Sequence, residues 1–298
     1  MPTRILLEYS RYFQLHGPVG LMSALYRRVR RFKAKSFSSH CGMLAGRCGV
    51  EVGGPSRIFS AQGIFPLYPV VAALDNVTFA SRTIWEGDLS RDGEYHFDAG
   101  KLPGRQFILD ATDLSGVAAG SYDFLLSSHV LEHLANPLRG LYEWLRVVKE
   151  GGALVLVLPH RDGTFDHLRP VTTIEHMLED YAQERDEHDV SHVEETRELH
   201  DLKYDDGVSG RAEFEQRLRN NATERSLHHH VFSTRTVAQL LDRAGLQILS
   251  LETVRPCHIV AVAVKVAHKA DEVNRQFLDT TSPLYSRSPF RTDRTERH

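Results

Sequence analysis

The sequence predicts an α/β protein built on a doubly wound sheet that is mostly parallel and has an antiparallel C-terminal strand. Three observations support this prediction. Short apolar runs alternate with helical patterns over residues 49–158. One of these runs, Ala153–Leu158, is continuously apolar, as is typical of a strand buried on both faces of a parallel sheet. Two later runs are joined only by Arg255-Pro256, a connection too short for parallel strands.

The expected elements follow in order along the chain. Strands are predicted at Gly49–Val52, Val70–Val77, Gln106–Leu109, Ser121–Ser128, Ala153–Leu158, Leu246–Val254 and Cys257–Val266. Helices are predicted at Leu138–Lys149 and Thr234–Arg243. In both helical segments apolar residues recur at helical spacing, and glycine follows shortly after the last turn.

The composition divides the chain into three parts. Residues 1–47 form a basic extension with nine Lys and Arg side chains and a single Glu. Residues 48–270 carry the strand and helix pattern of the main domain. Within it, residues 160–232 are polar, histidine-rich and too long for a plain connection, so we interpret them as a helical insertion over the substrate site. Residues 271–298 are polar, and we expect a frayed tail.

The basic extension contains one amphipathic segment, Val19–Lys35, with apolar residues along a single helical stripe. Two interpretations remain open. The helix packs on the main domain with a solvated basic face, or it contacts a membrane surface or an acidic partner. Residues 175–225 hold 16 acidic and 7 basic side chains. This acidic stretch is one candidate partner for the basic helix, either within the same chain or in the second copy of a homodimer.

Composition also excludes several classes of protein. Charged residues make up 25% and apolar residues 41% of the 298 residues, ordinary proportions for a globular protein. The apolar runs are far shorter than the ~20 residues of a transmembrane helix, and Glu8 interrupts any signal-peptide core. Three cysteines exclude a disulfide framework, and a net charge of −3 gives no general attraction to nucleic acid. We therefore expect a cytoplasmic protein.

Acidic residues occur near the ends of the first three predicted strands. Glu51 precedes the turn Gly53-Gly54, Asp75 lies near the end of the second strand, and Asp110 follows the third. In open α/β sheets ligands bind outside the carboxyl ends of the strands, where glycine lets a ligand approach the backbone. An acid about 20 residues after the glycine turn suits ribose hydroxyls. Together these residues predict a site for an adenosine-like ligand.

These segments resemble class I S-adenosylmethionine-dependent methyltransferases. The resemblance rests on G-V-E-V-G-G, L-D-N, L-D-A-T-D-L, G-S-Y-D-F-L-L-S-S-H-V-L-E-H-L-A-N-P and L-R-V-V-K-E-G-G-A-L-V-L-V-L-P, which occur in the order seen in that family. It covers residues 45–160 and, more loosely, the two terminal strands. The chain departs from the family at the glycine loop, where Gly53-Gly54-Pro55 replaces the usual E-x-G-x-G-x-G.

The resemblance implies a Rossmann-like methyltransferase sheet and S-adenosylmethionine as cofactor. By resemblance, the cofactor site comprises Glu51, Gly53, Gly54, Asp75, Asp110, Ala111, Ser128 and His129. The first three would line the methionine part, Asp75 would hold the ribose, and Asp110 with Ala111 would hold the adenine. Ser128 and His129 would flank the cofactor at the end of the fourth strand.

A rival motif overlaps this region. His129–His133 fits the pattern H-x-x-E-H of an inverted zinc-protease site, which should lie on a helix with both histidines facing a metal. Here the pattern directly follows an apolar strand and precedes Asn136-Pro137. That context favours the methyltransferase interpretation.

Histidine follows the fifth predicted strand, where the resemblance places the methyl group. A hydroxyl is a poor nucleophile unless a base takes its proton, and histidine suits that task near neutral pH. We therefore predict His160 as the catalytic base, with Asp162 and His229 as further catalytic residues. The alternative is that His160 is a hydrogen-bonded core residue.

The insertion supplies the predicted acceptor site. The candidate substrate-binding residues are Asp166, His167, Arg169, Tyr181, His228 and His230. Polar side chains beside aromatic faces such as Phe165 suit a sugar. A divalent metal on Asp162, Asp166, His167 or the run His228–His230 is a second hypothesis, with Mg²⁺ favoured by oxygen ligands and zinc, iron or nickel by imidazoles.

The segments L-P-H-R-D-G-T-F-D-H-L-R-P-V-T-T and L-H-H-H-V-F resemble methyltransferase-domain proteins of bacterial polysaccharide and sugar modification, including the mycobacterial methylmannose polysaccharide type. This resemblance implies an O-methyltransferase that acts on a hydroxyl of a sugar or oligosaccharide. Two alternatives remain: an N- or C-methyltransferase of another small polar metabolite, and an inactive cofactor-binding partner subunit.

Overall fold

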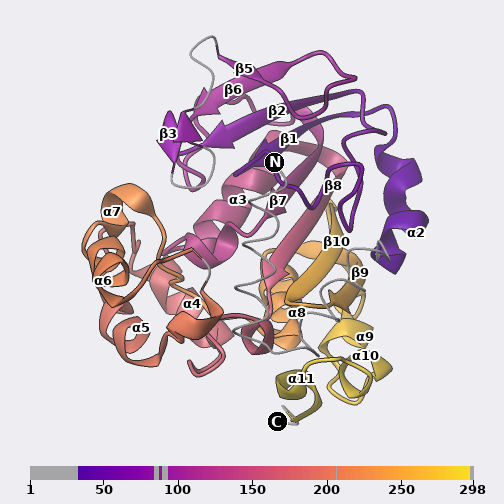
Figure 1. Ribbon diagram of the computed structural model, residues 1–298. Helices are drawn as coiled ribbons and strands as arrows, with labels where there is room; N and C mark the ends of the chain where they lie inside the picture. Colours follow the sequence, from indigo (N-terminus) through magenta and orange to yellow (C-terminus); the bar gives the residue numbers. More distant parts are fainter. Residues whose placement is uncertain (1–32, 84–86, 89–92, 206, 296–298) are drawn as a thin grey trace.

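The computed structural model describes residues 33–83, 87–88, 93–205 and 207–295 (Figure 1). All but the last three residues of the predicted helix Val19–Lys35 lie outside this range. Within the described residues, no helix is both long and apolar enough to cross a membrane.

The core of the fold is an eight-stranded sheet with strand order β5-β6-β2-β1-β7-β8-β10-β9. Its strands are β1 (Cys48–Val52), β2 (Ala73–Thr78), β5 (Glu94–Tyr95), β6 (Gly104–Ile108), β7 (Tyr122–Ser128), β8 (Val148–Pro159), β9 (Leu246–Val254) and β10 (His258–Lys265). Neighbouring strands from β6 to β8 pair in parallel, whereas β10 pairs antiparallel to both β8 and β9, and β5 pairs antiparallel to β6. The predicted mostly parallel sheet with an antiparallel C-terminal strand is confirmed.

The continuous apolar run in β8 has a direct structural cause. Leu154, Leu156 and Leu158 pack into the hydrophobic cluster on one face of the sheet. The alternating residues Ala153, Val155 and Val157 pack into the cluster on the other face. Because side chains alternate between the two faces of a strand, only a strand that is covered on both sides needs an uninterrupted apolar sequence.

Helices cover one face of the sheet. They are α3 (Pro137–Val147) and α8 (Thr234–Arg243), and their apolar sides join the same cluster as Leu156. Both helices begin at a side-chain cap: Asn136 accepts a hydrogen bond from the Arg139 amide, and Ser233 accepts one from the Thr236 amide.

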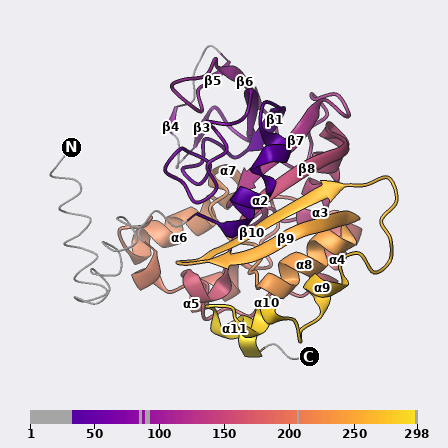
Figure 2. The same ribbon diagram turned by 90° about the vertical axis from the view of Figure 1, so that its right-hand side faces the viewer.

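The other face departs from the expected alternation of strands and helices. It is covered by α2 (Lys35–Leu44) and by the irregular segment 53–72, which buries Phe59, Phe65 and Leu67. Figure 2 shows α2 and α8 on opposite sides of the pair β9–β10. The fully described crossovers 53–72 and 109–121 contain turns and no helix. Between β2 and β6 lies a short hairpin, β3 (Arg82–Thr83) with β4 (Gly87–Asp88).

The insertion 160–232 consists of short helices gathered on one side of the molecule (Figure 1). They are α4 (Ile174–Ala182), α5 (Val193–Leu199), α6 (Arg211–Arg219) and α7 (Asn221–Glu224), with single turns of 3-10 helix at Arg161–Gly163 and Leu202–Tyr204. A small hydrophobic cluster of Val208, Phe214, Leu218 and Leu227 holds its outer part together.

The C-terminal segment is folded, so the expectation of a frayed tail is wrong. It forms α9 (Arg275–Leu278), α10 (Pro283–Ser286) and α11 (Arg291–Thr295). Phe277 and Tyr285 are buried, and the Tyr285 hydroxyl donates a hydrogen bond to the Phe277 carbonyl. Asp293 of α11 is also buried, against residues that follow β8.

Candidate functional site

A cavity of about 640 Å³ opens at the carboxyl ends of β1, β2, β6, β7 and β8. The strand-end residues that line it are Gly53, Thr78, Phe79, Leu109, Ala111, Ser128, His129 and Pro159. The insertion adds Phe165, Tyr204, Asp205, Arg217, Arg225 and His228. This is the edge at which open α/β sheets bind ligands, and its volume is typical of a small-molecule site.

The glycine turn after β1 requires glycine for two reasons. Gly53 has φ +81°, and a Cβ atom there would lie 2.4 Å from Val130 Cγ2. Of the two glycines predicted to bind the cofactor, Gly53 lines the cavity, whereas Gly54 packs against Glu51 and Tyr95.

Glu51 does not face the cavity, contrary to the prediction that it lines the methionine part of the cofactor. Its side chain is fully buried behind the glycine turn. The carboxylate accepts hydrogen bonds from the Tyr68 hydroxyl at 2.7 Å, the Tyr95 hydroxyl at 2.5 Å and the Ser56 amide at 3.1 Å. Glu51 therefore supports the turn from behind.

Asp75 does not lie at the strand end where the sequence analysis predicts a ribose-binding acid. It is the third residue of β2, three residues before the strand ends at Thr78, and is not among the described residues that line the cavity. Its carboxylate accepts hydrogen bonds from the Arg105 amide and the Tyr122 hydroxyl. Thr78 and Phe79 occupy the strand end that the ribose-binding acid was expected to reach.

The third strand end combines a predicted residue with one that the sequence analysis missed. Asp110 is not itself among the described lining residues, but it lies between two of them, Leu109 and Ala111. Arg225, from the loop after α7, places Nη2 2.5 Å from Asp110 Oδ2 and its guanidinium 4.9 Å from the Phe79 ring centre. Burial alone would raise the pKa of Asp110, but hydrogen bonds from Arg225 and Thr112 lower it. No local sequence pattern indicated Arg225, because it meets the strand only through the fold.

Ser128 and His129, which are predicted to flank the cofactor, line the cavity at the end of β7 and just after it, respectively. The Ser128 Oγ is buried and has no hydrogen-bond partner among the described residues. His129 adopts φ +56°, and its Nε2 lies 3.1 Å from His258 Nδ1. The H-x-x-E-H pattern spans a strand end and the 3-10 turn Leu131–His133, so the α-helix that an inverted zinc-protease motif needs is not formed.

The insertion contributes a buried carboxylate–imidazole pair. Asp166 Oδ2 lies 2.5 Å from His228 Nδ1, and His228 lines the cavity beside Glu132 and His133. Arg169 holds this pair: its Nη1 donates to Asp166 Oδ1 at 2.9 Å and to the His228 carbonyl at 2.8 Å. The structure thus brings together three of the six predicted substrate residues.

In this pair, each residue stabilises the charged form of the other and so shifts its pKa. Burial would raise the pKa of Asp166, but His228 and Arg169 lower it to about 2. Burial would lower the pKa of His228, but the Asp166 carboxylate raises it above 6.5. Asp166 is therefore ionised over the whole physiological pH range, and His228 titrates above the usual pKa of histidine.

The predicted catalytic base, His160, is a core residue instead. Its side chain is fully buried outside the cavity and stacks on Phe290, with ring centres 4.0 Å apart. Its Nδ1 accepts from the Asp162 amide, so its Nε2 carries the proton and donates to Asp293 Oδ1 at 3.1 Å. Asp162 in turn accepts from the amide and hydroxyl of Thr292. The side chains of His160 and Asp162 are therefore both bonded to residues of the folded C-terminal segment.

The remaining predicted residues lie elsewhere in the insertion. His229 is fully buried outside the cavity, and burial lowers its pKa to about 3. His167 pairs with Asp201 at 3.1 Å, and the exposed Tyr181 packs against Tyr142. His230 belongs to a separate cluster described below. Of the predicted metal ligands, Asp166 meets His228, whereas Asp162 bonds Thr292 and His167 pairs with Asp201, so the predicted set does not form one site.

The sheet order and the cavity at its carboxyl edge define an α/β enzyme of the methyltransferase class. The model of the methyltransferase domain family matches residues 75–251, so the chain belongs to that family. The predicted enzyme class, an S-adenosylmethionine-dependent methyltransferase, is confirmed.

Solved structures matched to this chain include two S-adenosylmethionine-dependent methyltransferases. The enzyme from Mesorhizobium loti is 14% identical, with a TM-score of 0.44, and the match covers 77% of this chain and 96% of that one. The enzyme from Aquifex aeolicus is 14% identical, with a TM-score of 0.39, and the match covers 87% of this chain and 98% of that one. No curated protein matches the chain.

The cavity residues fit this cofactor. Phe79, Leu109 and Ala111 form an apolar wall that suits an adenine ring. Ser128 lines the cavity, and its Oγ is a buried polar atom that has no hydrogen-bond partner among the described residues. When bound, S-adenosylmethionine supplies a methyl group activated by a positively charged sulfur.

Proposed function

We propose that this methyltransferase acts on a hydroxyl of a polar, sugar-like acceptor and that His228 is the general base. The pairing of Asp166 with His228 at the cavity wall is the observation that carries the proposal. A buried carboxylate that orients an imidazole toward a substrate cavity is the arrangement by which enzymes take a proton from a hydroxyl.

The tautomer follows from the hydrogen bond. When His228 is neutral, its Nδ1–H donates to the ionised Asp166, which leaves the lone pair of Nε2 available to accept a proton. Asp166 then stabilises the imidazolium that forms when the acceptor hydroxyl loses its proton. Arg169 fixes the second oxygen of Asp166, so the carboxylate keeps its orientation.

The polar lining near His228 supports a hydroxylic acceptor. Glu132, His133, Tyr204 and Asp205 line the same cavity and offer donors and acceptors for further hydroxyl groups. Phe165 lines the same cavity; its ring stacks on His200 and lies 4.7 Å from the His228 ring, centre to centre. A neutral amine already carries a nucleophilic lone pair and would not need a base of this kind.

The proposed base predicts how activity depends on pH. A base must be neutral to accept a proton, so activity should be low in acid and rise as His228 deprotonates. Because Asp166 raises the pKa of His228, the midpoint should lie above 6.5. In Asp166→Asn the midpoint should move to lower pH and the maximal rate should fall. A wild-type rate that does not change across this range would contradict the assignment.

Cofactor binding tests the strand-end assignments. We propose that Asp110 accepts from the adenine amine, so Asp110→Ala should weaken binding of the demethylated cofactor by about 1–3 kcal/mol. Asp75→Asn should bind it like the wild type, because Asp75 lies three residues before the end of β2, where the Arg105 amide and the Tyr122 hydroxyl hold its carboxylate. Isothermal titration of both variants checks this expectation. The assignment is wrong if Asp75→Asn is the variant that loses affinity.

A further inference from the structure

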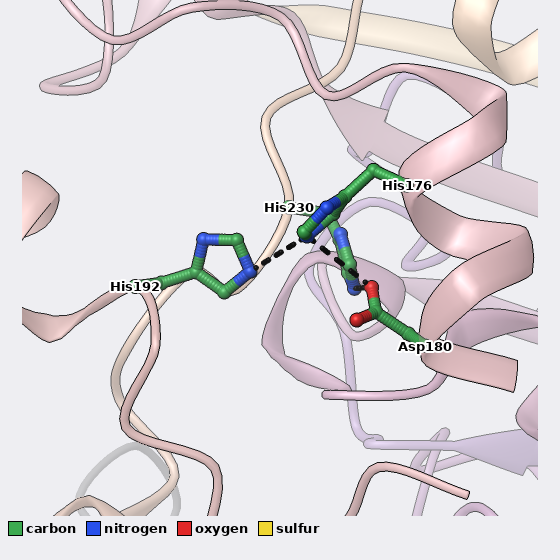
Figure 3. Close-up of side chains that lie close together, drawn as sticks. All are labelled: His176, Asp180, His192 and His230. Carbon is green, nitrogen blue, oxygen red and sulfur yellow. Dashed lines mark hydrogen bonds and ion pairs between the residues drawn. The ribbon is translucent and has the colours of Figure 1, made fainter. Parts of the chain in front are cut away.

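Four side chains converge in the insertion, away from the catalytic cavity (Figure 3). His176 and Asp180 lie one turn apart on α4, His192 precedes α5, and His230 precedes α8. The nitrogen and carboxylate oxygen atoms that they offer all lie within 4.8 Å of one another. None of the four is among the described residues lining the cavity.

Hydrogen bonds leave this cluster incompletely satisfied. The Nε2 atoms of His176 and His192 face each other at 3.1 Å. Asp180 Oδ2 lies 3.4 Å from His176 Nε2 and 3.8 Å from His230 Nε2, yet this buried oxygen has no hydrogen-bond partner among the described residues. Burial raises the pKa of Asp180 to about 6. An unsatisfied buried carboxylate is costly unless a cation compensates it.

His230 contributes a second buried polar atom that lacks a hydrogen-bond partner among the described residues. Its Nε2 lies 3.4 Å from the Ala135 carbonyl oxygen, and its Nδ1 has no hydrogen-bond partner within the described part of the chain. A neutral imidazole carries one N–H and one lone pair. With the proton on Nδ1, the Nε2 lone pair lies 3.8 Å from Asp180 Oδ2 and is free to ligate a metal ion.

We propose that His176, Asp180, His192 and His230 bind one divalent transition-metal ion, with Zn²⁺ as the best fit. Three imidazoles and one carboxylate form a four-ligand set that suits tetrahedral Zn²⁺. The 3.1 Å separation of two ligand nitrogens is close to the spacing of about 3.3 Å that Zn–N bonds of 2.0–2.1 Å give in a tetrahedron. Four protein ligands make a closed site, so the ion is structural.

The ion would join three segments of the insertion that are far apart in the sequence. It would tie α4 to His192 and to His230, which lies two residues after His228. His176 is 38% exposed, so the ion has a route from solvent. The proposal is independent of the proposed acceptor and base, because metal binding is measured without methyl transfer.

The experiment uses the full-length protein, dialysed against a chelator and titrated with Zn²⁺ alone. We expect one ion per chain by elemental analysis and a higher melting temperature on binding. Loading with Co²⁺ should give the visible absorption of a tetrahedral site. His176→Ala should lower metal affinity by at least about 100-fold, because even outer-shell partners are worth 10- to 100-fold.

Two further variants make the result decisive. Asp180→Asn should lose affinity to a similar degree, and His188→Ala, an exposed histidine of the same insertion, should bind like the wild type. His176 is half-exposed on a helix surface, so its variant keeps the test valid if Asp180→Asn fails to fold. The proposal is overturned if the wild type binds no stoichiometric ion, or if His176→Ala binds as tightly as His188→Ala.

Discussion

Replacing His228 by alanine is expected to lower kcat by about 10²–10⁴, the usual contribution of a positioned general base. The substitution removes the imidazole that pairs with Asp166 at the cavity wall. Affinity for the demethylated cofactor should change little, because the expected adenosine contacts come from the strand ends. Single-turnover rates and a binding titration separate the two effects.

The matched control for this prediction is His188→Ala, which removes an exposed histidine from the same insertion and should retain wild-type activity. The competing candidate is His129, which also lines the cavity and lies 3.4 Å from the buried Glu132 carboxylate. If His228→Ala stays active while His129→Ala is inactive, the base lies at the end of β7 and the Asp166–His228 pair is structural.

Replacing Arg169 by alanine should cost about 3–5 kcal/mol of folding free energy, as expected when one partner of a buried ion pair is removed. The guanidinium is 1% exposed and bonds Asp166, Glu195 and the His228 carbonyl. Without Arg169, the buried Asp166 carboxylate keeps a hydrogen bond to a single side chain among the described residues, that of His228. Urea unfolding of the wild type and the variant measures the difference.

An exposed arginine provides the comparison. Arg211 on α6 is 53% exposed and pairs with Glu215, so Arg211→Ala should cost at most about 1 kcal/mol. Arg169→Lys should fall between the two variants, because lysine restores the charge and not the forked geometry. A loss in Arg169→Ala as small as that of Arg211→Ala would mean that the insertion does not depend on this buried charge network.

The sheet could be predicted from the sequence because its signals are local. The alternating burial of β8 requires a continuous apolar run, and the two-residue link before β10 requires an antiparallel pair. The irregular cover over residues 53–72 could not be predicted in the same way. Its buried Phe59 and Phe65 follow no helical or strand period, so only contact with the finished sheet fixes them.

The site was predicted less well because its contacts are long-range. The position of Asp75 after the glycine turn suggested a strand end, but β2 continues to Thr78. His160 does follow β8, yet its role depends on Asp293, 133 residues away. Asp166 and His228 were both identified as candidates from residue type, but no pattern connects positions 62 residues apart. Composition identified the residues, and the fold determined their partners.

The central claim, methyl transfer to a hydroxyl oxygen with His228 as base, is tested most directly by following the methyl group itself. The wild type and His228→Ala are incubated with S-adenosylmethionine labelled with ¹³C in its methyl group and with a panel of sugars, oligosaccharides and polar amines. We predict a ¹³C signal of an oxygen-bound methyl group that the wild type forms and His228→Ala does not. A nitrogen- or carbon-bound methyl group, or equal product from both proteins, would contradict the account.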